Sequence, residues 1–266
     1  MIAFPHIHPV AFSLGPFAVH WYGISYLVSV LLGWRLANKR RNQVEGLTSN
    51  LLRELVYAVA LGAVLGGKCG HFLFYSPHHW QDPLALFRLW EPGMSFHGGL
   101  IGVLLGIIWF CRRFSFRFWT IVDFVAPIVP IGLGLVRLAN FINAELWGSV
   151  TTLPWGIVFP GAGPLPRHPS QLYEAFGEGL VLYVFLAVVV RQLQRTAAVH
   201  QTAVKEGLVS GFFAIGYAVI RFTLEFVRMP DPQLGYLAFG WLTMGQLLCL
   251  PLLCAGVYLV SIRGRY

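Results

Sequence analysis

Charged side chains are scarce in this chain: Asp, Glu, Lys and Arg make up only 11% of its 266 residues, whereas 56% are hydrophobic. A soluble domain averages roughly 25% charged residues. Several apolar runs reach the about 20 residues that a helix needs to cross a bilayer. The scarcity of charge therefore excludes a soluble enzyme and predicts an all-α, polytopic membrane protein.

Three further absences narrow the class. The four cysteines lie in or at the edge of apolar runs without the pairing of a metal site, so we interpret them as buried small hydrophobic residues. No Lys or Arg precedes Trp21, so the positive segment of a cleavable signal peptide is not visible. The two halves show no repeat, which disfavours a transporter with a site at the bilayer midplane.

Seven membrane spans are predicted, within a single integral membrane domain covering residues 1–266. To within a few residues at each end, the expected spans are about 17–37, 51–75, 96–111, 119–141, 171–190, 207–228 and 237–261. The segment between spans four and five, residues 146–169, is rich in Gly and Pro and is not expected to form a long helix. We expect it to form a small extracytoplasmic head.

The distribution of basic residues predicts the orientation of these spans. Most of the 19 Lys and Arg residues fall in the first, third and fifth loops between spans and in the tail. The opposite loops hold only Arg88 and Arg167. By the positive-inside rule, the N-terminus lies outside and the C-terminus lies in the cytoplasm. The net charge of +8 is therefore a topology signal, and no nucleic-acid partner is expected.

With this topology, the unusual polar residues gather at the outer ends of the spans. Ionisable groups within spans are costly and usually functional. At a rise of 1.5 Å per residue, Arg221 is expected to lie about 10 Å deeper in the membrane than Arg228. Positive charge over this range of depth in the outer leaflet suits a lipid headgroup with its phosphate. The residues concerned are His20, Tyr22, His97, Arg137, Asn140, Asn143, Glu145, His168, Arg221, Glu225 and Arg228.

Each of these elements also has a purely structural interpretation. His20 and Tyr22 fit an interfacial aromatic belt. The glycines that follow His97 form a small-xxx-small stripe that lets a second helix approach closely. Asn140 and Asn143 fit contacts between helices. Arg221, Glu225 and Arg228 share a helix face as a brace, which still leaves one surplus positive charge and favours an anion site.

Six motifs together carry a resemblance to a known family. They are HWYG (20–23), GGK (66–68), SFHGGL (95–100), RLANFINAELWG (137–148), RHPSQLYE (167–174) and EFVR (225–228). In this order, over nearly the whole chain, they resemble the bacterial prolipoprotein diacylglyceryl transferases.

The resemblance implies an enzyme of the bacterial inner membrane whose active site faces the outer leaflet. Such an enzyme moves the diacylglyceryl group of phosphatidylglycerol onto the lipobox cysteine of a prolipoprotein signal peptide and releases glycerol 1-phosphate. Its partners are phosphatidylglycerol, prolipoprotein signal peptides and membrane lipids. No metal and no organic cofactor are expected. Two alternatives remain open, an outward-facing lipid transporter and a lipid-binding assembly protein without chemistry.

The chemistry assigns roles to the polar residues. A cysteine thiol of pKa about 8.5 benefits from a nearby base, and His97 is the first candidate. Charge grows on the leaving phosphate, so Arg137 and Arg228 are expected to stabilise it, Arg137 also binding the lipid. The remaining predicted substrate-binding residues orient the lipid or hold the arginines: His20, Tyr22, Asn140, Asn143, Glu145, His168, Arg221 and Glu225.

Overall fold

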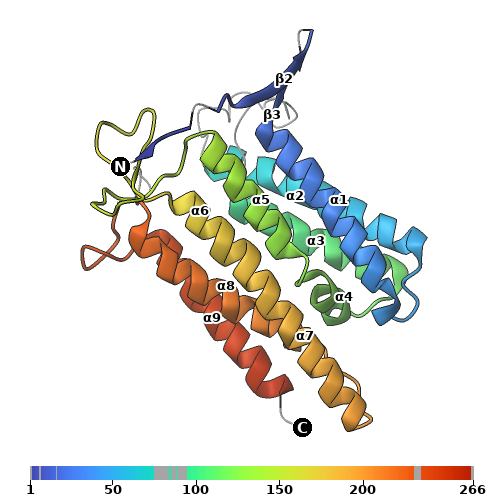
Figure 1. The fold of residues 1–266 in the computed structure, drawn as a ribbon. Coiled ribbons are helices and arrows are strands. Elements are labelled where there is room, and N and C mark those ends of the chain that lie inside the picture. The colour runs from blue at the N-terminus through green and yellow to red at the C-terminus, as the bar shows by residue number, and fades with distance from the viewer. Residues whose placement is uncertain are drawn as a thin grey trace. The chain divides into compact units, whose positions relative to one another are not determined.

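The computed structural model describes residues 2–5, 7–15, 17–74, 84, 88, 95–230 and 235–264, most of which are helical (Figure 1). The chain forms two compact units. One comprises Trp34–Phe124, and the other combines Met1–Gly33 with Val125–Tyr266. Helix α1 (Trp21–Arg40) begins in the second of these units, directly after the short antiparallel pair β2 (Val10–Leu14) and β3 (Phe17–His20).

The unit of residues 34–124 is built around two long helices. After the single 3₁₀ turn η1 (Arg41–Gln43), α2 (Ser49–Phe74) and α3 (Phe96–Phe114) run side by side, followed by the short α4 (Phe118–Val125) (Figure 1). Ser95 caps α3, because its hydroxyl accepts a hydrogen bond from the backbone N–H of Gly98.

Glycine lines the contact between α2 and α3. A Cβ placed on Gly70 would lie 2.8 Å from the Cα of Gly98, and one on Gly102 would overlap the carbonyl oxygen of Gly62. The two backbones therefore touch directly, which only glycine permits at these positions. The packing interpretation of the stripe after His97 is confirmed.

The other unit contains the remaining long helices. Helix α5 (Val129–Ile142) lies beside a continuous helical segment made of α6 (Ser170–Glu174), the π-helical turn η4 (Ala175–Val181) and α7 (Leu182–Val199). Helix α8 (Leu208–Leu224) with the short η5 (Glu225–Val227) packs against both α7 and α9 (Met244–Arg263) (Figure 1).

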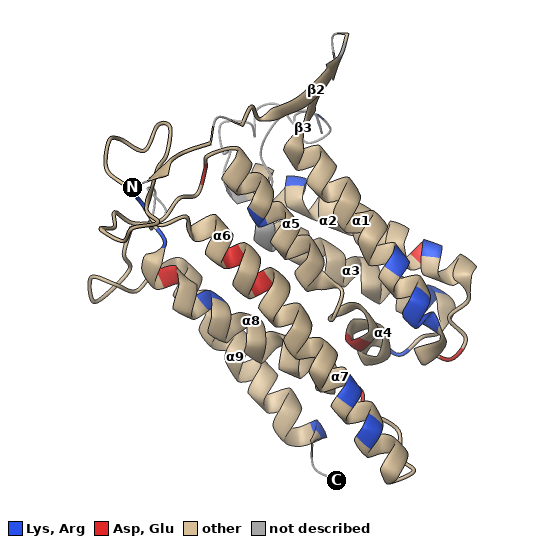
Figure 2. Cartoon of the chain, in the orientation of Figure 1, with Lys and Arg blue, Asp and Glu red and all other residues tan. Residues whose placement is uncertain are grey.

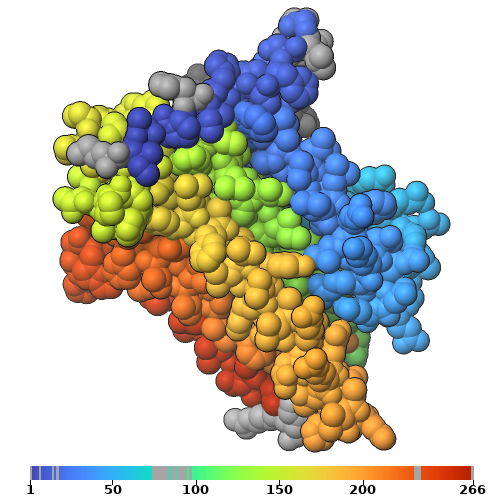
Figure 3. Space-filling view, in the orientation of Figure 1, coloured from blue at the N-terminus to red at the C-terminus, as the bar shows by residue number. Residues whose placement is uncertain are grey.

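Residues 146–169 form an ordered, non-helical segment with a small core of its own. Strand β4 (Ile157–Val158) pairs in parallel with β1 (Ile2–Ala3), and Arg167 pairs with both Val150 and Ile157. Phe4, Ile157 and Phe159 are buried together at its centre. The space-filling view shows the dark-blue N-terminal residues lying against this yellow-green segment (Figure 3).

Four helices among the described residues are long and apolar enough to cross a membrane. They are Ser49–Leu73, Ser170–Val199, Leu208–Val227 and Met244–Arg263, and the pair α4 and α5 makes a fifth if it counts as one bent span. Much of their apolar surface faces outward. On α9, for example, Leu247, Val257 and Ile262 are exposed. The prediction of a mostly helical membrane protein is confirmed.

Three predicted spans differ in their ends or their straightness from the observed helices, for identifiable reasons. Residues 17–20 form β3, so the first helix begins at Trp21. The predicted span 119–141 is bent by 45° between α4 and α5, where Pro127 has no N–H to donate. The last helix begins at Met244 because Gly235 and Gly240 have positive φ and residues 237–242 form a turn.

Candidate functional site

Three arginines and three glutamates form one network between α5, α6–η4 and α8–η5. The Nε of Arg137 lies 3.3 Å from the nearest oxygens of Glu174 and Glu178. Arg221 contacts Glu174, Glu178 and Glu225, and Arg228 lies 3.0 Å from Glu174. Glu174 and Glu178 are completely buried, and Figure 2 shows acidic residues in red near the start of this helical segment.

The positions of two glycines explain how Arg137 reaches these carboxylates. A Cβ on Gly134 would lie 3.1 Å from the Cα of Gly179, so α5 and η4 touch backbone to backbone one turn from the ion pairs. Because η4 is a π-helix, it also changes the spacing of side chains next to Glu174 and Glu178. Such turns are frequent at functional sites.

Glu174 and Glu178 are not among the site residues predicted from the sequence. Two acidic residues inside an apolar span were the signal that would have found them. Arg221, Glu225 and Arg228 were expected to carry one surplus positive charge. With Arg137, Glu174 and Glu178 included, the network has three positive and three negative groups.

The three arginines differ in how far they are engaged. Both terminal nitrogens of Arg221 contact carboxylates. Among the described residues, Arg137 is held only through Nε and Arg228 only through Nη1. Two guanidinium nitrogens on each of these two side chains therefore remain for a ligand, and a planar pair of N–H donors suits a phosphate.

Glu225 is fixed by the start of the last helix. Its Oε1 accepts a hydrogen bond from the Thr243 hydroxyl at 3.0 Å, and Thr243 also caps α9 in a capping box with Gln246. The positive end of the α9 dipole and the adjacent Arg221 together stabilise the carboxylate. The ion pair joins Glu225 to Arg221, and the predicted role of Glu225 in holding an arginine stays a prediction.

A second polar group lies at the end of α5. The Tyr22 hydroxyl donates to Glu145, and the Asn140 amide N–H₂ donates to Tyr22 and, at 3.0 Å, to Glu145. Glu145 thus contacts Tyr22 and Asn140 and, among the described residues, no arginine. The amide oxygens of Asn140 and Asn143 have no hydrogen-bond partner in the described structure. Unpaired buried acceptors are energetically costly, so these two amide oxygens can accept hydrogen bonds from a ligand donor such as a hydroxyl.

The turn after α5 brings Glu145 back toward Tyr22. Ala144 and Leu146 both adopt the left-handed backbone conformation, with φ of 53° and 57°, which is uncommon for residues with a Cβ. The start of α6 holds this turn, because Gln171 donates to the carbonyl of Glu145 at 2.6 Å and Ser170 donates to that of Leu146 at 3.0 Å.

The three predicted histidines have different positions. His168 lies in the segment 146–169, with Nδ1 3.4 Å from the Tyr173 hydroxyl, and burial lowers the pKa of its imidazole below the usual value. His20 ends β3 and is exposed, and among the described residues no side-chain contact joins it to the arginines. His97 lies in the first turn of α3, in the unit Trp34–Phe124, and its side chain lies outside the described part of the structure.

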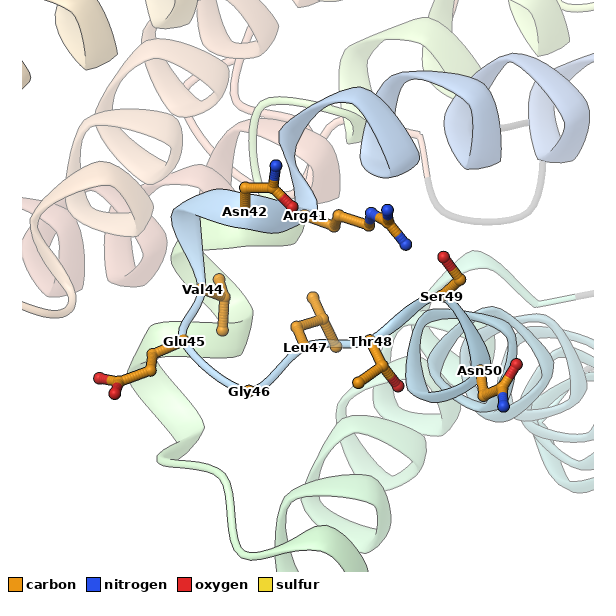
Figure 4. Close-up of a pocket in the computed structure, with 9 residues that line it drawn as sticks. All are labelled: Arg41, Asn42, Val44, Glu45, Gly46, Leu47, Thr48, Ser49 and Asn50. Atoms are coloured by element: carbon orange, nitrogen blue, oxygen red, sulfur yellow. The ribbon is translucent and has the colours of Figure 1, made fainter.

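Elsewhere, a cavity of about 630 Å³ lies in the unit Trp34–Phe124, where η1 leads into α2 (Figure 4). It is lined by Arg41, Asn42 and the residues from Val44 to Asn50, and it contains none of the predicted site residues. Within the described residues, no group of three or more His, Cys, Asp or Glu side chains is arranged to hold a metal ion. The candidate site is therefore the arginine network together with the side chains of Asn140 and Asn143 at the end of α5.

Known proteins resemble this chain over almost its full length. The family described as prolipoprotein diacylglyceryl transferase matches residues 9–262. The phosphatidylglycerol–prolipoprotein diacylglyceryl transferase of Methylococcus capsulatus is 50% identical over 264 residues, covering 98% of this chain and 97% of the relative. The protein of the same name from Pseudomonas paraeruginosa is 48% identical over 262 residues, covering 98% and 95%. The chain therefore belongs to the prolipoprotein diacylglyceryl transferase family.

Proposed function

We propose that this chain transfers the diacylglyceryl group of phosphatidylglycerol to the lipobox cysteine of prolipoproteins. The names of the relatives support this substrate pair. The observation that carries the proposal is the placement on α5 of Arg137, with two uncommitted N–H₂ groups, beside Asn140 and Asn143, with unpaired acceptor oxygens. A phosphate needs donors and a glycerol hydroxyl needs an acceptor, and this helix face offers both.

The reaction joins the cysteine sulfur to a glycerol carbon. The thiol loses its proton, the thiolate attacks the carbon that carries the phosphate ester, and the carbon–oxygen bond breaks. Glycerol 1-phosphate leaves with the bonding electrons. The negative charge on the leaving phosphate grows during this step, so Arg137 and Arg228 contribute most at the transition state. No cofactor is needed to balance the step.

The remaining predicted residues support this chemistry. His97 takes the thiol proton as a general base. Tyr22, Asn140 and Asn143 orient the headgroup, and Glu145 fixes Tyr22 and Asn140. Arg221 and Glu225 brace the network. In this proposal, His20 and His168 contact the lipid or the peptide.

The proposed location is the bacterial inner membrane. The chain would cross it seven times, adding α1 and α3 to the five candidate spans, with the N-terminus outside and the C-terminus in the cytoplasm. Arg191 and Arg195 near the end of α7 are exposed and support this orientation. Figure 2 shows basic residues in blue along that part of α7. Residues 146–169 would form an extracytoplasmic head that receives the extended lipobox peptide.

The test is direct transfer by the purified protein. Phosphatidylglycerol labelled in its acyl chains is incubated with the protein and a lipobox peptide, and the peptide should gain the label through a thioether. A control peptide with Ser in place of the lipobox cysteine should gain none. Binding of the lipid without transfer would instead favour the assembly-protein alternative, and movement of lipid between leaflets would favour the transporter.

A further inference from the structure

One carboxylate occupies the centre of the arginine network. Glu174 contacts Arg137 through Oε2 and both Arg221 and Arg228 through Oε1. No other described carboxylate contacts all three arginines: Glu178 contacts two, and Glu225 contacts Arg221 alone. Glu174 is also completely buried. It is thus the group that fixes where the two partly free arginines point.

The same contacts place Glu174 in competition with a bound phosphate. An anion that binds Arg137 and Arg228 must share them with a carboxylate that already lies 3.3 Å from one and 3.0 Å from the other. The network has three positive and three negative groups, so it carries no net charge to hold an anion tightly. A product that keeps its phosphate would otherwise bind these partly buried arginines strongly, because charge–charge attraction increases as the local dielectric falls.

We infer that Glu174 is a positioning residue that also limits the affinity of the site for the phosphate of the released product. It holds Arg137 and Arg228 in place for the transition state, and its negative charge then helps the glycerol phosphate to leave. This inference rests on the proposed function, because it takes a phosphate monoester as the product.

The matched variants are Glu174→Gln, Glu178→Gln and Glu225→Gln. Each removes one negative charge from the same network and keeps a side chain of similar size. Only the first removes a carboxylate from both Arg137 and Arg228, the second removes one of the two carboxylates that contact Arg137, and the third removes one from neither arginine. A uniform effect of net charge would therefore raise the affinity for the product equally in all three variants. Local competition predicts that this affinity rises most in Glu174→Gln, less in Glu178→Gln and least in Glu225→Gln.

Two readouts are measured on the full-length protein in detergent. The first is inhibition of lipid transfer by glycerol 1-phosphate, with kcat and the KM for phosphatidylglycerol determined separately. The second is the increase in melting temperature caused by glycerol 1-phosphate, which needs no turnover. We expect Glu174→Gln to bind glycerol 1-phosphate at least about tenfold more tightly, equivalent to about 1.4 kcal/mol, and to lower kcat without raising KM. Glu178→Gln should show a smaller gain, and Glu225→Gln the smallest.

The outcomes separate the two proposals. If the native protein transfers lipid but Glu174→Gln binds the product no more tightly, the role of Glu174 is wrong. If the native protein transfers no lipid while the variant still gains affinity for glycerol 1-phosphate, the proposed function fails and the competition stands. Should Glu174→Gln not fold, Glu178→Gln decides: equal product affinity in Glu178→Gln and Glu225→Gln would overturn the inference.

Discussion

Replacing Arg137 with lysine tests whether the geometry of the guanidinium matters or only its charge. The side chain of Arg137 is anchored through Nε, and its two terminal nitrogens have no partner among the described residues. Lysine keeps the positive charge but has a single nitrogen. If that nitrogen pairs with Glu174 and Glu178, it no longer presents a two-pronged donor to the lipid phosphate.

The expected loss follows from the number of contacts. A hydrogen bond to a charged group contributes roughly 1.5–3 kcal/mol, and Arg137→Lys loses at least one such bond to the phosphate. Each 1.36 kcal/mol corresponds to a factor of ten, so kcat/KM should fall by about 10- to 150-fold. Most of the loss should appear in kcat, because the charge on the phosphate is largest in the transition state.

The assay is the steady-state rate of lipid transfer to a lipobox peptide, measured over a range of phosphatidylglycerol concentrations. Arg195→Lys is the matched control, since Arg195 is an exposed residue of α7 outside the network. The control should keep the native rate. Native kcat/KM in Arg137→Lys would show that charge alone suffices and would refute the bidentate argument.

Three other predictions concern the base, the topology and the head. His97→Gln should retain the fold and lose about 10²–10⁴-fold in transfer rate, the usual contribution of a general base, and near-native rates at pH 6–8 would remove that role. In a background without the native cysteines, Ser149→Cys should react with an impermeant thiol reagent added outside the inner membrane, while Gln194→Cys should react only after the membrane is opened; the opposite pattern would place the site in the cytoplasm. Burial lowers the pKa of His168, so the folded protein binds fewer protons than the unfolded chain as the pH falls below about 6.5. The melting temperature should therefore decrease on the acid side and decrease less in His168→Gln; equal acid sensitivity in both proteins would contradict this.

Sequence patterns predicted the local part of the site and missed its long-range part. The i, i+3 spacing put Arg137 and Asn140 on one face of α5, and the i, i+4 spacing paired Arg221 with Glu225, as the structure has it. Glu174 and Glu178 come about 40 residues after Arg137, and they meet it because Gly134 and Gly179 let two helices touch. No local signal specifies which pair of helices makes such a contact.

The errors at span ends have a similar origin. Residues 17–20 and 237–243 are as apolar as the helices that follow them, so hydropathy alone extends those helices too far. In the structure, residues 17–20 pair as a strand with residues 10–14, and residues near Gly240 form a turn, so both helices begin later in the sequence. The position of His97 relative to the arginines depends on how the two units pack and stays a prediction.

The glycines between α2 and α3 set a limit on engineering this protein for stability. Replacing a helical glycine with alanine is a standard way to raise melting temperature, worth up to about 1 kcal/mol per site through helix propensity. Here the rule reverses, because an added methyl group on Gly102 would collide with the carbonyl of Gly62. At Gly245 a Cβ would lie 2.7 Å from the Glu225 carboxylate, so that carboxylate of the arginine network would have to shift. A stabilisation screen should therefore leave these glycines unchanged and choose exposed positions on α7 or α9 instead.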